Sequence, residues 1–188
     1  MSALREKFFE RSPVDCARDL IGAEFRWDGC SGKIVETEAY SDRGDPACHT
    51  FFRPSARTFV ENHPPGAAYV YLNYGVHWLF NILTRDADGS GFVLLRALEP
   101  RTGLEMMRQR RGGRRDRELC SGPGRLCQAL GIEGSAHGSC FLSEEKRGLA
   151  VSSENIRVVA GPRIGIRRAV DLPWRFGEAG SAYLSRAF

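Results

Sequence analysis

Apolar residues near the start of the chain recur at the spacing of an α-helix. Ser12 and Pro13 are followed by apolar side chains at positions 14, 17, 20 and 21, and then by Gly22. Serine commonly caps a helix, proline fits its first turn, and glycine often follows its last turn. The pattern predicts a helix over residues 13–21.

Later apolar segments have the composition of strands. β-branched and aromatic residues are concentrated in residues 33–40, 67–72, 77–84 and 92–98, and such residues favour strands. Two more helices are predicted, over residues 101–111 and from the segment 121–124 to Gly131, followed by a last strand over residues 156–167. Together these elements predict an α+β fold: a single domain over residues 1–188, with a curved, mainly antiparallel sheet flanked by helices.

A tight turn is predicted between the second and third of these strands, which would form a protruding β-hairpin. The turn contains Gly75, which accepts backbone conformations that other residues resist, and Tyr74 lies at its tip. An aromatic ring gains little from its own fold there, and beside basic residues it is suited to insertion between stacked DNA bases. Tyr40, Tyr69 and Tyr71 either stack on an extruded base or belong to an ordinary core.

Glu36 and Glu38 are predicted to share one face of their strand with Tyr40, because side chains alternate between the two faces. Two neighbouring carboxylates on a covered face would raise the pKa of one of them, as a general base near neutral pH requires. On a solvent-facing strand both glutamates would be inert. The spacing alone does not choose between Glu36 and Glu38.

Arg96 interrupts the otherwise apolar strand over residues 92–98. A buried guanidinium needs a carboxylate partner, and Glu36, Glu38 and Glu99 are the candidates. The pair is either a structural salt bridge or a catalytic pair that holds a water molecule.

The composition bounds the class of protein. The chain has 188 residues, of which 42% are hydrophobic, enough for one core. Its first residues are too highly charged for a signal peptide, and no segment approaches the 18 apolar residues of a membrane span. We therefore expect a cytoplasmic protein without a membrane partner, associated with the nucleoid if the source is prokaryotic.

The cysteines and histidines do not form a metal-binding pattern. The six cysteines and four histidines contain no Cys-x-x-Cys and no ligand-spaced pairs, which also excludes the zinc deaminases. We expect buried, reduced thiols, no metal and no cofactor.

Basic residues are unevenly placed, although the net charge is only +4. Seven arginines lie from Arg108 to Arg125, which is typical either of a solvated face or of a nucleic-acid contact. Within this region Ser121-Gly122-Pro123-Gly124-Arg125 opens a predicted helix, whose backbone amides would favour a phosphate oxygen. A plain turn is the alternative.

Several of these motifs resemble, in order, those of the alkyladenine (3-methyladenine) DNA glycosylase family, and the match runs from about residue 12 to residue 176. The segment 34–40, Ile-Val-Glu-Thr-Glu-Ala-Tyr, resembles the family's catalytic strand, and residues 69–81 resemble its intercalating hairpin. Two further motifs are 94–100, Leu-Leu-Arg-Ala-Leu-Glu-Pro, and 116–123, Asp-Arg-Glu-Leu-Cys-Ser-Gly-Pro.

The resemblance implies roles for individual residues. Glu38 would be the general base that activates water, Arg96 would help to orient that water, and Tyr74 would fill the gap left by a flipped nucleotide. Asn81 would reject the exocyclic amine of guanine. The implied base pocket consists of Tyr40, Ala47, His49, Tyr71, Asn81 and Leu94. The implied contacts to the DNA backbone are Arg57, Ser121, Gly122 and Arg125.

The expected activity is hydrolysis of the N-glycosidic bond of 3-methyladenine, hypoxanthine or ethenoadenine in double-stranded DNA by a monomer. A lyase would need an amine nucleophile, and Lys7, Lys33 and Lys146 lie outside the matched motifs. Two other classes stay open: a nucleic-acid-binding protein without catalysis, and a hydrolase of small nucleosides. The first gives Glu38 no chemical role, and the second leaves Tyr74 and the arginine cluster unexplained.

Overall fold

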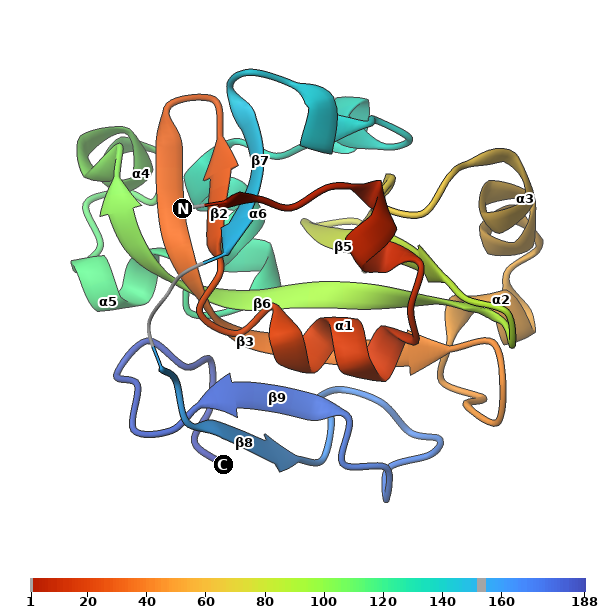
Figure 1. The fold of residues 1–188 in the computed structure, drawn as a ribbon. Helices are drawn as coiled ribbons and strands as arrows, with labels where there is room; N and C mark the ends of the chain where they lie inside the picture. The colour runs from red at the N-terminus through yellow and green to blue at the C-terminus, as the bar shows by residue number, and fades with distance from the viewer. Residues whose placement is uncertain (1, 152–154) are drawn as a thin grey trace.

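The two longest strands, β3 (Cys30–Ser41) and β6 (Ser90–Thr102), pair antiparallel at the centre of the molecule. The computed structural model describes residues 2–151 and 155–188. The strands form one sheet in the order β1-β7-β2-β3-β6-β5-β4, with β9 paired to both β3 and β8, and every pairing is antiparallel. The expected mainly antiparallel sheet with flanking helices is confirmed (Figure 1).

The remaining strands are shorter and surround this central pair. They are β1 (Ser2–Ala3), β2 (Glu24–Trp27), β4 (Ala68–Asn73), β5 (His77–Arg85), β7 (Arg147–Val151), β8 (Val158–Gly161) and β9 (Arg175–Glu178). The α-helices are α1 (Pro13–Asp19), α2 (His49–Phe52), α3 (Pro54–Asn62), α4 (Leu104–Arg110), α5 (Asp116–Leu119) and α6 (Pro123–Leu130). Three short 3-10 helices are η1 (Glu6–Phe9), η2 (Gly134–Ala136) and η3 (Phe141–Ser143).

One edge of β3 changes partner along its length. Its first residues pair with β2, whereas Glu36, Thr37 and Glu38 pair with β9. The register between β3 and β6 also shifts on both sides of Glu36, and such irregularities re-aim side chains next to functional sites. This arrangement brings the last part of the chain against the two glutamates.

Helix α1 covers one face of the central strands (Figure 1). Thr37 points to this side, where its hydroxyl donates a 2.7 Å hydrogen bond to the carbonyl oxygen of Ala17. A cluster of aromatic rings, Phe25, Trp27, Phe80 and Phe141, lies in the main core. A second apolar cluster, which includes Phe59, Tyr69 and Phe92, supports α3 and one wall of the functional site.

The four strands predicted from composition are all present, and the helix over residues 13–21 is present but shorter. The helix expected over residues 101–111 is wrong at its start, because Arg101 and Thr102 continue β6 and Gly103, at φ 73°, separates them from α4. The strand expected over residues 156–167 is wrong beyond Gly161. Pro162 cannot donate a ladder hydrogen bond and Gly165 has a φ of 79°, so residues 162–168 form a loop.

Candidate active site

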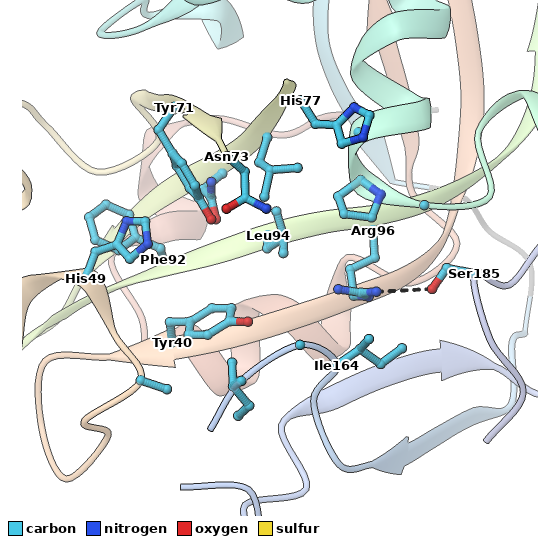
Figure 2. A pocket seen from close by; sticks show the side chains of 18 of the residues that line it. Tyr40, His49, Tyr71, Asn73, His77, Phe92, Leu94, Arg96, Ile164 and Ser185 are labelled. Carbon is cyan, nitrogen blue, oxygen red and sulfur yellow. Dashed lines mark hydrogen bonds between the residues drawn. The ribbon is translucent and has the colours of Figure 1, made fainter. Parts of the chain in front are cut away.

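A cavity of about 1010 Å³ opens between the central strands, the hairpin and the last part of the chain. Its walls come from β3, β4, β5, β6, α2, the start of α6, the loop 162–168 and residues 185–186. Figure 2 shows Tyr71 and His49 next to each other, with Tyr40 across the cavity from them and Arg96 near its inner end.

Glu38 is completely buried directly behind the lining of this cavity. Its Oε2 accepts a 2.7 Å hydrogen bond from the Tyr40 hydroxyl and lies 3.2 Å from Nη1 of Arg96. Its Oε1 accepts a 2.6 Å hydrogen bond from the backbone N–H of Ile164. Tyr40, Arg96 and Ile164 all line the cavity, so the carboxylate is bound by three residues of the cavity wall.

Burial raises the pKa of Glu38 above its ordinary value. The positive charge of Arg96 and the hydrogen bonds from Ile164 and Tyr40 act in the opposite direction, and the negative charge of Glu36 adds to the rise. A raised carboxyl pKa is what a base that accepts a proton near neutral pH requires.

Arg96 pairs with both Glu36 and Glu38. The prediction that this buried guanidinium has a carboxylate partner is confirmed. Its Nε donates a 2.9 Å hydrogen bond to Oε1 of Glu36, while Nη1 faces Glu38. Glu99, the third candidate, instead pairs with Lys33 at 2.9 Å. The solvent-facing alternative for Glu36 and Glu38 is therefore wrong, since both carboxylates are fully buried.

Glu36 differs from Glu38 in how completely it is bound. Its carboxylate accepts hydrogen bonds from Arg96 and Arg175 at 2.9 and 2.8 Å, and from the backbone N–H and hydroxyl of Ser185 at 2.6 and 2.8 Å. Two guanidinium groups and a serine thus fix the orientation of its carboxylate, which suits a supporting role.

The ring of Tyr40 rests on a buried guanidinium. The carbon of the Arg163 guanidinium lies 4.6 Å from the Tyr40 ring centroid and 5.4 Å from that of Trp174. Arg163 also donates two hydrogen bonds to Asp45, at 2.6 and 2.7 Å, and one to the carbonyl oxygen of Ala39 at 2.9 Å. This pair ties the loop 162–168 to the end of β3 and fixes one wall of the cavity.

His49 and Tyr71 form part of the opposite wall. Their ring centroids are 4.5 Å apart, and Nδ1 of His49 shares a 3.0 Å hydrogen bond with the Tyr69 hydroxyl. Burial, aided by the charge of Arg53, lowers the pKa of His49 to about 4. The imidazole is therefore neutral near pH 7.

Asn81 and Leu94 are cross-strand neighbours on β5 and β6, and both line the cavity. The Asn81 amide donates a 3.1 Å hydrogen bond to the carbonyl oxygen of Tyr69, which fixes the orientation of this buried side chain. Ala47 also lines the cavity, from the segment between β3 and α2. The structure therefore brings together all six residues expected in the base pocket.

The expected hairpin is formed by β4 and β5, whose last pair is Asn73 and His77. Tyr74, at φ 50°, and Gly75, at φ 70°, lie in its turn. The Tyr74 side chain is 89% exposed although it borders the cavity. Its own fold gives this ring almost no burial.

The residues expected at the DNA backbone fall into two places. Ser121, Gly122 and Arg125 line the cavity at the start of α6, and the Arg125 guanidinium donates a 3.2 Å hydrogen bond to the Ser121 hydroxyl. Arg57 does not line it; this residue lies on α3, where its guanidinium donates a 2.8 Å hydrogen bond to the carbonyl oxygen of Thr50.

Several residues of the site were not found by sequence reasoning. Four of them contact Glu38, Tyr40 or Glu36 from distant parts of the chain: Ile164, Arg163, Arg175 and Ser185. The fifth, Asp45, pairs with Arg163. The sequence signal for this loop is the basic, glycine-containing run at residues 163–168, most of which falls within the strand predicted over residues 156–167. Three of its arginines, Arg163, Arg167 and Arg168, lie in or beside this loop.

Five of the cysteines are buried and all six are free, but the expectation of burial is wrong for Cys140, which is exposed at the segment before η3. Among the described residues, no three histidine, cysteine or acidic side chains are placed to share a metal ion. No helix in the described part of the chain could cross a membrane.

Comparison with known proteins gives a consistent result. A family model described as methylpurine-DNA glycosylase matches residues 7–182. A putative 3-methyladenine DNA glycosylase of Nitrosospira multiformis is 50% identical, over 96% of this chain and 92% of its own. Proteins with the same description in Nitrobacter winogradskyi and Rhizobium meliloti are each 49% identical, over 98% and 96% of this chain and 88% and 95% of theirs.

Proposed function

Since this chain belongs to the methylpurine-DNA glycosylase family, we propose that it releases 3-methyladenine, hypoxanthine and ethenoadenine from double-stranded DNA in base excision repair. Water attacks C1′ of the nucleotide as the bond from C1′ to N9 of the purine breaks. The bonding electrons leave with the base, and the proton of the water passes to Glu38. The product is an abasic site with an intact DNA strand.

The observation that carries this proposal is the environment of Glu38. One buried carboxylate with a raised pKa can accept the proton of water and also stabilise the positive charge that develops on the sugar. The water reaches it at the inner end of the cavity, between Tyr40, Arg96 and Ile164, when a nucleotide fills the space in front. A cationic base such as 3-methyladenine leaves without further protonation.

The cavity fits an extruded purine. Tyr40 provides one aromatic wall, and His49 with Tyr71 provides the other (Figure 2), as base-flipping enzymes require. Asn81 selects among purines: its amide is fixed by Tyr69, so it cannot move away from the exocyclic amine of guanine.

The surroundings of the cavity fit duplex DNA. Tyr74 occupies the place of the extruded nucleotide, and exposed aromatic rings serve this purpose in other DNA-bending proteins. Ser121, Gly122 and Arg125 bind phosphate beside the cavity, while Arg57 binds it farther along α3. The chain acts as a monomer, as one domain over residues 1–188 and without a cofactor.

A panel of duplexes, each with one damaged purine, tests the proposal. Purified protein in EDTA is expected to release the damaged base and leave abasic sites that break only after alkali treatment. Binding without release would favour a nucleic-acid-binding protein, and release from free nucleosides but not from DNA would favour a nucleoside hydrolase. Strand cleavage without alkali would contradict a monofunctional mechanism, which fits a cavity with no lysine among its described lining residues.

A further inference from the structure

Ser185 contacts both members of the Glu36–Arg96 pair. Its hydroxyl donates a 2.8 Å hydrogen bond to Oε1 of Glu36. It also accepts a 3.3 Å hydrogen bond from Nη2 of Arg96 (Figure 2). The backbone N–H of the same residue donates to Oε2 of Glu36 at 2.6 Å. One serine thus contacts both members of the pair.

Each nitrogen of the Arg96 guanidinium has a different partner. Nε binds Glu36, Nη1 faces Glu38 and Nη2 binds Ser185. A guanidinium is planar and rigid, so it cannot rotate toward one carboxylate without breaking its contact to another group. Ser185 therefore limits Arg96 to a single contact with Glu38.

The segment that carries Ser185 is itself anchored. The Phe188 ring lies 3.9 Å from the guanidinium carbon of Arg175, and Arg175 donates hydrogen bonds to the carbonyl oxygens of Arg186 and Ala187. A Cβ atom added to Gly177 would lie only 2.3 Å from the Phe188 ring. The glycine on β9 thus makes room for this ring.

We propose that Ser185 is a positioning residue that keeps one acceptor position of Glu38 available for the attacking water. An ionised carboxylate has about four lone-pair positions, and the described donors Tyr40, Arg96 and Ile164 each use one. If Arg96 rotated into the strong two-bond arrangement that arginine makes with carboxylates, it would use the last one. The inference rests on the proposed function, because it assigns this position to the water of that reaction.

Charged and titratable groups from several elements face Glu38, and each of them influences its ionisation. They are Glu36 and Tyr40 on β3, Arg96 on β6, Tyr71 on β4 and Arg163 in the loop 162–168. Of these, only Glu36 and Arg96 contact Ser185. A change at Ser185 therefore reaches Glu38 through Arg96, by its contact with the carboxylate, and through Glu36, by its charge.

The test compares Ser185→Ala with the wild type in single-turnover base release from hypoxanthine-containing duplex. We expect a rate about tenfold lower, the effect of losing one hydrogen bond that orients a charged group, and an unchanged Kd for DNA. Loss of the Ser185 hydroxyl allows Arg96 to pair more closely with Glu38, and this pairing stabilises the ionised carboxylate. Because the base acts when ionised, the acidic limb of the rate profile should move to lower pH.

Two variants separate positioning from simple packing. Ser185→Thr keeps the hydroxyl and should retain the wild-type rate. Ser181→Ala is the matched control: it removes a hydroxyl that accepts a hydrogen bond from the backbone N–H of Tyr183, and it should also retain the wild-type rate. The inference would be overturned by any of three results: a wild-type rate in Ser185→Ala, an acidic limb that does not move or moves to higher pH, or equally slow Ala and Thr variants at position 185. Phe188→Ala removes the ring that packs against Arg175 and holds the segment of Ser185 in place, so it should also lower the rate.

Failure of the inference is distinguishable from failure of the proposed function. If the wild type releases no damaged base, the proposed function fails first. If the wild type is active and Ser185→Ala has the same rate and pH profile, only the positioning role is refuted. Thermal unfolding of each variant shows whether a lower rate reflects lost folded protein.

Discussion

The backbone N–H of Ile164 donates a 2.6 Å hydrogen bond to Oε1 of Glu38, although 126 residues separate the two in the chain. A backbone donor cannot be removed by changing its own side chain, so the loop 162–168 has to be held in place by other contacts. The buried pair of Arg163 with Asp45 provides them. The geometry of Glu38 therefore depends on a salt bridge that does not touch it.

Breaking this salt bridge should affect both stability and catalysis. In Asp45→Asn, the Arg163 guanidinium loses its anionic partner while both side chains are fully buried. We expect the free energy of unfolding to fall by about 3 kcal/mol and base release to slow, because Ile164 loses its position. Urea unfolding and single-turnover kinetics measure the two effects.

An exposed ion pair is the matched control for that variant. Asp28 pairs with Arg147 at 2.7 Å but remains 42% exposed, and Asp28→Asn should cost less than about 1 kcal/mol. Equal losses in the two variants would contradict the importance of burial at Asp45.

Replacing the proposed base should separate binding from chemistry. Glu38→Gln is expected to bind lesion-containing duplex with a similar Kd and to release the base at least about a hundredfold more slowly. Glu99→Gln changes a carboxylate that pairs with Lys33 outside the cavity lining, and should keep the wild-type rate. Full activity of Glu38→Gln would refute the mechanism.

The buried histidine should make the protein less stable in mild acid. Burial lowers the pKa of His49 to about 4, from an ordinary value of 6.5 that the unfolded chain retains. As the pH falls from about 6.5 to about 4, the unfolded chain binds a proton that the folded chain does not, so the free energy of unfolding falls. Urea unfolding at several pH values should show a smaller decrease for His49→Gln than for the wild type; identical decreases would argue against this assignment.

The hairpin tip should contribute to DNA binding and not to stability. Because Tyr74 is 89% exposed, Tyr74→Ala should leave the unfolding midpoint unchanged. We expect the Kd for lesion-containing duplex to rise about tenfold, the scale of one lost stacking contact with a base. Tyr74→Phe keeps the ring and should bind like the wild type, and weak binding by both variants would indicate that the hydroxyl matters instead.

The side chain at position 81 should set which purines are accepted. Asn81→Ser shortens a buried amide that is fixed against Tyr69, and the vacated space can hold the exocyclic amine of guanine. Release of guanine from a mismatch should rise about tenfold relative to hypoxanthine. Measuring both bases with the same protein preparation corrects for lost stability, and an unchanged ratio would remove Asn81 from the selection of substrates.

Regular patterns made much of the fold and part of the site predictable. Alternation placed Glu36, Glu38 and Tyr40 on one face, and the isolated charge of Arg96 required a carboxylate near it. The turn residues around Gly75 marked the hairpin and the exposed ring. Each of these signals is local, because it depends on residues within one or two neighbouring elements.

The rest of the site depends on contacts between distant segments. Alternation could not distinguish Glu36 from Glu38 as the proposed base. In the structure the two carboxylates differ in their partners, because Ser185 and Arg175 bind Glu36. The sequence predicts a strand over residues 156–167, whereas the structure ends it at Gly161. The loop conformation follows from Pro162 and Gly165 and from the packing of Arg163 against the Tyr40 ring. The contact between Arg163 and Tyr40 joins distant segments, so the pattern of apolar and polar residues cannot predict it.

The order of partners around Glu36 has a consequence for synthesis. Among the described residues, three of the four hydrogen bonds to this carboxylate come from Arg175 and Ser185, which lie 139 and 149 residues later in the chain. A nascent chain that ends before β9 has an unpaired edge on β3 and a poorly neutralised acid beside Glu38. Because domains generally fold as units during synthesis, Glu36 and Glu38 can acquire these contacts only after β9 and Ser185 have been synthesised.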